Sequence, residues 1–202
     1  MQLLIASNNS GKIQEVKQIL HGLPLQVVTP VSLAEKKTEF SHLVKLKVAE
    51  TGLTYQDNAL LKAQAFGKAS GIMAIADDSG LEVKALNNFP GVQSNRWSPG
   101  TDAQRNSALL KKLKNIQDRS ARFVTLVCLF KPQDNSHYFF EGQVYGQIAS
   151  LPAGMSGFGY DPIFIPDGYK KTFAQLGISE KNKLSHRWQA LTKLKEYLIT
   201  QL

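Results

Sequence analysis

The amino-acid sequence predicts an α/β fold with a mixed β-sheet. Short apolar runs typical of buried strands alternate with stretches whose apolar residues recur at helical spacing. Two apolar runs, 122–130 and 138–148, are joined by the turn-forming segment Pro132–Ser136, which indicates an antiparallel hairpin. The chain has 202 residues, of which 43% are hydrophobic and 20% charged. These values are ordinary for a single globular domain, and we take residues 1–202 as that domain.

The first part of the chain predicts a strand, a polar loop, a helix and a second strand. Gln2–Ala6 is an apolar run, and Ser7–Gly11 is a loop of turn-forming residues. Apolar residues then recur at helical spacing over 13–20, and the second strand is expected at Leu25–Val28. The region that follows has mixed charge and weak periodicity, and only a helix near 42–49 is expected there.

The centre of the chain predicts a capped helix followed by two strands around a polar turn. The segment 54–57 has the Thr-x-x-Asp spacing of a capping box, and the helix that it begins extends to Ser70. Apolar residues then predict strands at Ile72–Ala76 and Leu81–Leu86. Between these strands, Asp77–Gly80 is expected to form a tight loop.

The second half of the chain predicts a helix, the hairpin and a final helix. After the turn-rich segment 87–100, Thr101 or Asp102 caps a helix. Glycines in the second hairpin strand, at 142 and 146, indicate a bulge or a sharp twist. A loop rich in glycine and proline occupies 151–168, and Ser185 caps the last helix. The residues expected to face the core from the two helices are Leu109, Leu110, Leu113, Ile116, Leu191, Leu194, Tyr197 and Leu198.

Composition excludes several classes of protein. Cys128 is the only cysteine, so the chain is not a disulfide scaffold, and its apolar neighbours indicate a buried side chain. No run approaches the roughly 20 apolar residues that span a bilayer. No basic region precedes the apolar run at the N-terminus, so a signal peptide is not expected. From these features we expect a cytoplasmic protein.

The chain is basic, with 24 Lys and Arg residues against 16 Asp and Glu, a formal net charge of +8. A basic surface attracts polyanions over long range. Composition alone leaves three possibilities open: a nucleic acid, a small polyphosphate, or a basic surface that has no partner.

The segment Ser7–Lys12 ends the first strand and begins the first helix. Backbone N–H groups at such a helix start suit a phosphate, and Lys12 adds a positive charge. The segment is not a Walker A loop, since Ala6 stands where that motif needs glycine and Ile13 where it needs Ser or Thr. An ordinary capped helix start without a ligand is the alternative.

Two adjacent carboxylates, Asp77 and Asp78, lie between apolar strands. Such a pair repels and requires a partner, and Mg²⁺ binds through one or two carboxylates together with substrate phosphates. Neighbouring side chains of an extended chain point to opposite faces, so only one of the two is expected at a metal. The alternative is a polar turn in which one Asp caps backbone amides.

Two further segments carry groups suited to a nucleotide. Gly154–Pro162 combines glycines, which let a backbone approach a ligand closely, with the rings of Phe158 and Tyr160. The segment 180–187 brings basic side chains to a helix start, where an anion would offset their charge. These basic residues are Lys181, Lys183, His186 and Arg187. A loop whose aromatic rings fill the core and a solvated surface loop are the respective alternatives.

Six blocks of sequence together carry a resemblance that none of them carries alone. They are Ala6–Lys12, Glu50–Ala59, Ala76–Leu81, Phe89–Val92, Gly157–Phe164 and Glu180–Arg187. In this order they resemble the inosine triphosphate pyrophosphatases, the Ham1-like family that acts on non-standard purine nucleotides. The resemblance covers nearly the whole chain. It departs from the family at Asp57, where Glu is usual, and at Gln93, where Tyr is usual.

The resemblance implies a fold, a reaction and a set of residues. The family hydrolyses ITP, dITP and XTP to the monophosphate and pyrophosphate with Mg²⁺. It is a homodimer whose long twisted mixed sheet, flanked by helices, forms two lobes with a central substrate cleft. The resemblance implies that Asp78 is catalytic and that Glu50 and Asp78 bind the metal. The substrate contacts that it implies are Ser7, Asn8, Asn9, Ser10, Gly11, Lys12, Ser79, Phe158, Gly159, Tyr160, Asp161, Lys181, His186 and Arg187.

Two other functions remain open at this point. A basic nucleic-acid-binding module without catalysis would account for the net charge of +8. It would not account for Asp77 and Asp78, which repel phosphate unless a metal is bound. A related pyrophosphatase that acts on modified pyrimidines or other nucleotides is the second alternative. We expect a nucleoside triphosphate substrate, no specific nucleic acid and no membrane.

Overall fold

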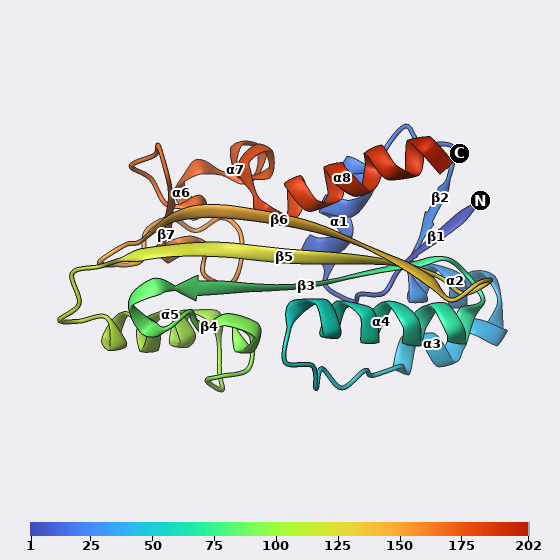
Figure 1. Ribbon diagram of the computed structural model, residues 1–202, viewed down its shortest axis with the longest axis horizontal. Coiled ribbons are helices and arrows are strands. Elements are labelled where there is room, and N and C mark those ends of the chain that lie inside the picture. The colour runs from blue at the N-terminus through green and yellow to red at the C-terminus, as the bar shows by residue number, and fades with distance from the viewer. Residues whose placement is uncertain (202) are drawn as a thin grey trace. The chain divides into compact units, whose positions relative to one another are not determined.

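The computed structural model describes residues 1–201, which divide into two compact units. Unit 1 comprises residues 1–78, 125–141 and Trp188 onward. Unit 2 comprises residues 79–124 and 142–187. The chain therefore passes from one unit to the other between Asp78 and Ser79, inside a strand (Figure 1).

The strands form a mixed sheet in the order β2-β1-β3-β5-β6-β7, with β4 (Phe89–Pro90) paired to β3. β1 (Gln2–Ile5) pairs in parallel with β2 (Gln26–Val28) and with β3 (Ala74–Val83). β7 (Phe164–Pro166) pairs antiparallel with β6 (Ser136–Ile148). The predicted hairpin is confirmed, since β5 (Ser120–Lys131) and β6 are neighbours in the sheet and follow one another along the chain. The predicted α/β fold with a mixed sheet is confirmed as well.

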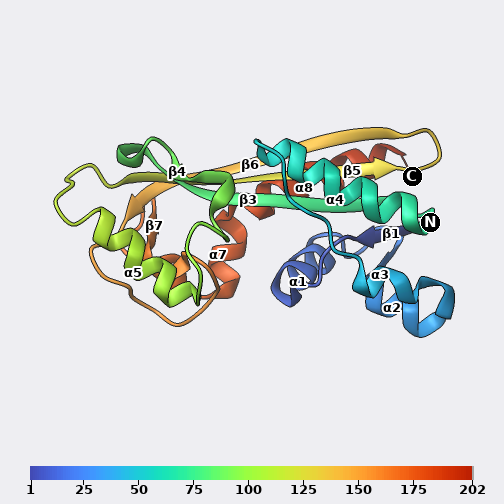
Figure 2. The same ribbon diagram turned by 90° about the horizontal axis from the view of Figure 1, so that it is seen from below.

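In unit 1, helices cover both faces of the sheet, and Figure 1 shows α8 and α4 on opposite sides of the strands. Leu3 and Ile5 of β1 belong to the core beneath α1 (Ser10–Ile19) and α8 (His186–Gln201). Leu4 belongs to the core beneath α2 (Pro30–Lys36), α3 (Ser41–Lys45) and α4 (Tyr55–Ser70). Figure 2 shows α2 and α3 side by side next to β1. The alternation along β1 follows from the two-residue period of a strand.

Cys128 of β5 lies in the second of these cores. Its side chain is fully buried, and burial raises the pKa of its thiol to about 12. The expectation of a small buried apolar side chain is confirmed.

Unit 2 has a core of its own, built from β3, β5, β6 and β7 together with α5 (Asp102–Lys112) and α6 (Phe173–Leu176). The helix α7 (Ile178–Leu184) precedes α8. Gly146 of β6 lies opposite Pro166 of β7. A Cβ at Gly146 would collide with the carbonyl oxygen of Ile165, so the structure explains this glycine by the close approach of β7.

The helices with local capping signals are confirmed. Thr54 and Asp57 form the predicted capping box at the start of α4, and Thr101 caps α5. The final helix begins at His186, directly after Ser185. The leucines expected at the core from α5 and α8 are buried or pack against a core. No helix within residues 1–201 is long and apolar enough to cross a membrane.

The prediction of a loop at Asp77–Gly80 is wrong, because β3 runs through this segment without interruption. The polar side chains are tolerated in a strand because Asp77 and Asp78 contact lysines from other elements. The predicted strand Leu81–Leu86 ends at Val83 instead, before a 3₁₀ turn whose next residue, Asn87, has a positive φ.

Two irregular segments differ from the prediction. The helix expected near 42–49 is present as α3 but ends at Lys45, and the sequence does not predict α2. α2 begins at Pro30 because Thr29 and Ser32 form a capping box around it. The loop predicted over 151–168 contains β7, which completes the sheet next to β6.

Candidate active site

The sequence-predicted site residues fall into two groups, one in each unit. Ser7–Lys12, Glu50 and Asp78 belong to unit 1. The members in unit 2 are Ser79, Phe158, Gly159, Tyr160, Asp161, Lys181, His186 and Arg187. In each unit a carboxylate of the predicted set contacts an ammonium group: Glu50 contacts Lys62, which is outside the predicted set, and Asp161 contacts Lys181.

Asp78 of β3 is buried against helix α4 and is 4% exposed. The side-chain Nδ2 of Asn58 donates a hydrogen bond to Asp78 Oδ2 over 3.0 Å. Nζ of Lys62 lies 3.7 Å from Asp78 Oδ1. Asn58 and Lys62 stand at positions i and i+4 of α4, so both reach the carboxylate from one face of the helix.

The ammonium group of Lys62 joins Asp78 to Glu50, since Nζ also lies 2.6 Å from Glu50 Oε1. Burial raises the pKa of the Asp78 carboxyl, and the Lys62 charge and the Asn58 hydrogen bond oppose that shift. The charges of Glu50 and Asp77 raise the pKa further. A desolvated carboxylate with a raised pKa is a stronger base than an exposed one, which suits it to accept a proton.

Asn58 is itself held in place by Gly52. The N–H of Gly52 donates to Asn58 Oδ1 over 2.8 Å. A Cβ at Gly52 would lie only 2.8 Å from that oxygen and 2.5 Å from Asp57 Cβ, so glycine is required here. Asp57 closes the capping box by accepting from the Thr54 N–H over 3.1 Å. An aspartate at this position, where the family usually has Glu, therefore leaves the cap intact.

The other carboxylate of the pair, Asp77, contacts a different lysine: Lys12 Nζ lies 2.9 Å from Asp77 Oδ2. Lys12 is in the first turn of α1, whose cap is Asn9, and Asn9 Oδ1 accepts from the Lys12 N–H over 3.0 Å. The first turn of α1 contains no acidic residue. This helix start therefore keeps the positive potential that favours an anion.

A pocket of about 200 Å³ opens beside these groups in unit 1. Its polar lining is Ser7, Asn8, Lys12, Glu50, Lys62 and Asp77, and its apolar lining is Ala6, Leu46, Val48 and Phe66. Two ammonium groups and two carboxylates thus line one cavity. Such a set can bind phosphate oxygens and a cation together.

Glu50 and Asp78 fit a hard divalent cation, because their carboxylate oxygens already share one positive charge, that of Lys62. Within residues 1–201, no three or more His, Cys, Asp or Glu side chains gather as a possible metal cage. The two carboxylates of Glu50 and Asp78 suit an ion such as Mg²⁺, because this ion commonly takes one or two carboxylates and completes its shell with substrate phosphates and water.

In unit 2, Asp161 is the centre of the second group and is 3% exposed. Its Oδ2 lies 2.6 Å from Lys181 Nζ and accepts from the Phe158 N–H over 2.8 Å. Gly157 has a φ of +83°, and a Cβ there would collide with Asp161 Oδ2. Burial raises the pKa of Asp161, and the charges of Lys181 and Arg187 oppose that shift.

The ring of Phe158 lies beside two cations. Lys181 Nζ is 4.5 Å from the ring centroid, and the guanidinium carbon of Arg187 is 5.5 Å from it. Both distances are in the range of cation–π contacts. A partly exposed aromatic ring next to hydrogen-bond donors can stack on a purine while the donors bond to its edge.

Two predicted contacts have buried rings in this structure. His186 is 4% exposed and stacks on Phe123, with ring centroids 4.7 Å apart. Tyr160 is buried, accepts a hydrogen bond from Trp97 Nε1 over 2.7 Å and donates to the Ser94 carbonyl over 2.6 Å. Tyr160 therefore corresponds to the structural alternative for its loop, a ring that fills the core.

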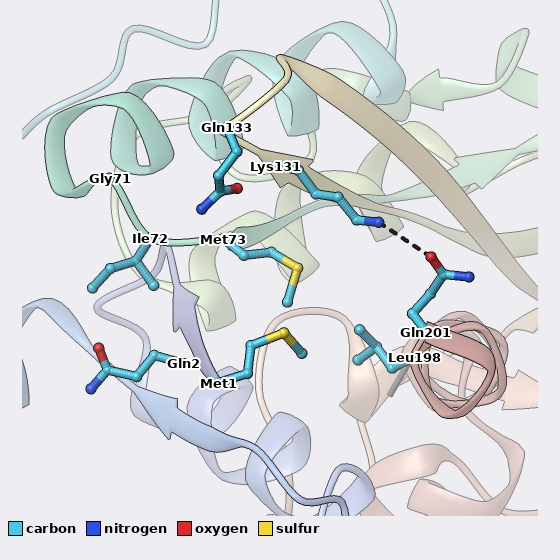
Figure 3. Close-up of a pocket in the computed structure, with 9 residues that line it drawn as sticks. All are labelled: Met1, Gln2, Gly71, Ile72, Met73, Lys131, Gln133, Leu198 and Gln201. Atoms are coloured by element: carbon cyan, nitrogen blue, oxygen red, sulfur yellow. Dashed lines mark hydrogen bonds between the residues drawn. The ribbon is translucent and has the colours of Figure 1, made fainter.

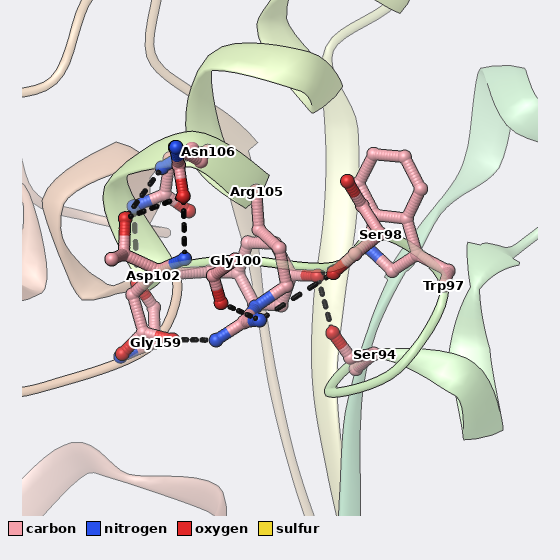
Figure 4. Close-up of polar contacts among 11 residues, drawn as sticks. Ser94, Trp97, Ser98, Gly100, Asp102, Arg105, Asn106 and Gly159 are labelled. Carbon is pink, nitrogen blue, oxygen red and sulfur yellow. Dashed lines mark hydrogen bonds and ion pairs between the residues drawn. The ribbon is translucent and has the colours of Figure 1, made fainter.

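Sequence reasoning missed residues that hold the predicted ones. Asn58 and Lys62 hold Asp78, while Asp102 and Asn106 of α5 hold Gly159 (Figure 4). Each pair has i, i+4 spacing on a helix, which was a usable signal for two side chains on one face. The spacing does not show which strand or turn these faces of α4 and α5 contact, because that contact depends on tertiary structure.

A larger pocket, of about 440 Å³, lies elsewhere in unit 1 and contains none of the predicted residues. Figure 3 shows it between Met1, Met73 and Leu198, with Lys131 donating to Gln201 over 3.5 Å. Lys131 is the charged side chain of this lining, and it also donates to the Tyr197 hydroxyl. Its lining does not combine carboxylates with ammonium groups, as the lining of the smaller pocket at the start of α1 does.

The Asp161–Lys181 pair yields a prediction about stability. We expect Asp161→Asn to lower the free energy of unfolding by about 3–5 kcal/mol, because it leaves the buried Lys181 ammonium group without its counter-charge. The measurement is equilibrium urea unfolding, with the exposed Asp167→Asn of the same unit as the matched control. A loss no larger than that of the control would contradict the prediction.

Comparison with known proteins shows similarity over almost the whole chain. The model of the Ham1 family matches residues 3–197. A protein of Aquifex aeolicus named dITP/XTP pyrophosphatase is 40% identical, over 96% of this chain and 95% of its own length. The solved structure of a HAM1 protein from Coxiella burnetii is 38% identical with a TM-score of 0.88, and the match covers 99% of both chains. The Staphylococcus aureus Ham1 protein is 39% identical with a TM-score of 0.87, and the match covers 100% of both chains.

Proposed function

The chain belongs to the Ham1 family, and on this premise we propose that it hydrolyses dITP, ITP and XTP to the monophosphate and pyrophosphate. The relative from Aquifex aeolicus bears the name dITP/XTP pyrophosphatase. The observation that carries the proposal is the contact of the buried Asp78 with Asn58 and Lys62. Lys62 also lines the pocket at the start of α1, where phosphates are expected.

In this proposal the triphosphate binds at the start of α1. The backbone N–H groups of the first helical turn and the side chains of Ser7, Asn8 and Ser10 supply hydrogen bonds to phosphate oxygens. Lys12 and Lys62 line the same pocket and supply positive charge to it. Phosphate then competes with Asp77 for Lys12 and with Glu50 for Lys62.

The cofactor in this proposal is Mg²⁺, held by Glu50 and Asp78 together with substrate phosphates. When bound, it neutralises charge on the phosphate oxygens and so lowers the barrier to attack on phosphorus. The Lys62 ammonium group, which now lies between the two carboxylates, would then be available to the phosphates.

Asp78 orients a water molecule and accepts its proton. The water oxygen forms a bond to the α-phosphorus while the bond from that phosphorus to the bridging oxygen breaks. Pyrophosphate leaves with the electrons of that bond, and Lys12 and Lys62 offset the charge that develops on it. Burial of Asp78 raises the pKa of its carboxyl and thereby strengthens it as a base.

The residues of unit 2 are proposed to select the base. Phe158 stacks on the purine ring, and Arg187 and Lys181 donate to its acceptors, with Asp161 fixing Lys181. His186, which is buried against Phe123, supports the base-binding residues from the core. Ser79, the residue that follows Asp78 in the chain, contacts the substrate. The family resemblance also leads us to propose a homodimer, which light scattering would detect as twice the mass of one chain.

The test is a panel of nucleoside triphosphates assayed for pyrophosphate release. We expect dITP, ITP and XTP to be hydrolysed far faster than ATP and GTP, and chelation of divalent cations to abolish release. Modified pyrimidine triphosphates belong in the panel, since a preference for them would favour the related pyrophosphatase instead. Release of orthophosphate rather than pyrophosphate would contradict attack at the α-phosphorus.

A further inference from the structure

The side chain of Phe158 is 37% exposed, so packing covers only part of it. It lies between Gly157 and Gly159, whose φ angles are +83° and +62°. Glycine reaches this left-handed region readily but loses the most backbone entropy when it is fixed there. A Cβ at Gly159 would meet nothing within 4 Å, so no close contact fixes this residue on that side. Other groups must therefore hold the turn in place.

Both polar groups of Gly159 are held by helix α5, as Figure 4 shows. The N–H of Gly159 donates to Asp102 Oδ2 over 2.8 Å, and Asn106 Nδ2 donates to the Gly159 carbonyl oxygen over 3.0 Å. Asp102 and Asn106 are at positions i and i+4 of α5, so they present a donor and an acceptor from one helix face. Together they form a two-point clamp on a single glycine.

Further contacts hold the two clamp residues, Asp102 and Asn106, in place. Arg105 forms an ion pair with Asp102, and its other terminal nitrogen donates to the Gly100 carbonyl oxygen over 2.7 Å. Asn106 is 2% exposed, so its amide cannot exchange its partner for bulk water. The next residue of the turn, Tyr160, is fixed by Trp97 and Ser94. The segment 94–106 thus holds the Phe158–Asp161 turn through residues outside the proposed base contacts.

We propose that Asp102 and Asn106 are positioning residues for base selection: they hold Gly159 and thereby place the Phe158 ring beside Lys181 and Arg187. The inference rests on the proposed function, which assigns Phe158, Lys181 and Arg187 to the base. Release of Gly159 restores rotation about its backbone and lets the Phe158 ring move relative to the two cations. A displacement of about 1 Å far from the chemistry can cost up to roughly 100-fold in rate.

The clamp can be tested without any assay of activity. Asn106→Asp keeps the size of the side chain, removes the Nδ2 donor and places a carboxylate against the Gly159 carbonyl oxygen. Asp102→Ala removes the acceptor of the Gly159 N–H and serves as the second variant. The matched control is Ser107→Asp, which adds the same charge at the exposed neighbouring position of α5.

Amide hydrogen exchange of the peptide that contains residues 157–161 is the measurement. We expect exchange about tenfold faster in Asn106→Asp and Asp102→Ala, with no change in Ser107→Asp. In the first two variants the turn can open locally without breaking both hydrogen bonds to Gly159, so opening costs less free energy. Thermal unfolding of each variant separates this local effect from loss of the fold. If the amide exchange rate of this peptide in both variants equalled that in Ser107→Asp, the proposal that Asp102 and Asn106 hold Gly159 would be overturned.

The link to specificity is tested by kcat/KM for dITP and dATP. We expect Asn106→Asp to lower the dITP value by about 10- to 100-fold and the dATP value much less. In a Phe158→Ala background the same substitution should have little further effect, since the two act through one ring. An equal loss in both backgrounds would overturn the specificity role. If the unsubstituted protein released no pyrophosphate from dITP, the proposed function would fail, while the exchange result would still decide the clamp.

Discussion

Asp78→Asn is expected to lower pyrophosphate release from dITP by a factor of about 10² or more, typical for loss of a positioned base or metal carboxylate. Asparagine preserves the size of the side chain but removes its negative charge and its basicity. The contact with Lys62 loses its charge, and Lys62 keeps its 2.6 Å contact with Glu50. The measurement is steady-state pyrophosphate release at saturating Mg²⁺, accompanied by thermal unfolding to show that the variant is folded.

Asp77→Asn provides the matched comparison, because it makes the same chemical change one residue earlier in β3. Asp77 contacts Lys12 of the phosphate-binding loop, so its loss should mainly raise KM. The exposed Asp134→Asn, in the hairpin turn, should be neutral in both parameters. If Asp78→Asn kept nearly full turnover while Asp77→Asn lost most of it, the catalytic residue would be Asp77 and not Asp78.

Arg187→Ala should reduce hydrolysis of ITP much more than hydrolysis of ATP and so narrow the ratio between them. Hypoxanthine and xanthine carry a 6-keto acceptor, whereas adenine carries a 6-amino donor. A guanidinium group has donors only and remains charged, so it matches the keto oxygen and opposes the amino group. A site built to bond one group can reject an analogue that lacks it by roughly 10⁴-fold. Arg187 is 3% exposed, which makes such a mismatch costly.

Guanine keeps the keto oxygen, so Arg187 cannot exclude it, and rejection of GTP must come from its 2-amino group. The ITP-to-GTP ratio should therefore change less than the ITP-to-ATP ratio in Arg187→Ala. Arg187→Lys retains the charge beside Phe158 but not the two-pronged donor geometry, and it should give an intermediate ratio. Loss of activity by one common factor on all nucleotides would show that Arg187 binds phosphate.

The elements that could be predicted from the sequence are those with local causes. The Thr54–Asp57 capping box and the Thr101 cap each lie within four consecutive residues or fewer, and both helices begin as predicted. The sequence wrongly predicts a loop at Asp77–Gly80, because the composition of this segment is typical of a turn. A strand continues there because Lys12 from α1 and Lys62 from α4 satisfy its carboxylates, and these contacts belong to tertiary structure.

The candidate site divides in the same way. Asp78, Glu50 and the Ser7–Lys12 loop could be proposed from motifs, since each motif is contiguous. The partners that tune or hold them could not, because Asn58 is 20 positions from Asp78 and Asp102 is 57 positions from Gly159. The i, i+4 spacing on a helix predicts that two side chains act together, but it does not identify the group that they contact.

Because Cys128 is buried, chemical labelling of its thiol can measure how often the surrounding core opens. With a thiol pKa of about 12, roughly one molecule in 10⁵ carries the reactive thiolate at pH 7, and the side chain has no access to solvent. Alkylating reagents and mild oxidants should therefore leave the folded chain unmodified. Because no other cysteine exists in the sequence, the rate of labelling under native conditions reports only molecules in which the core around Cys128, beneath α2, α3 and α4, has opened.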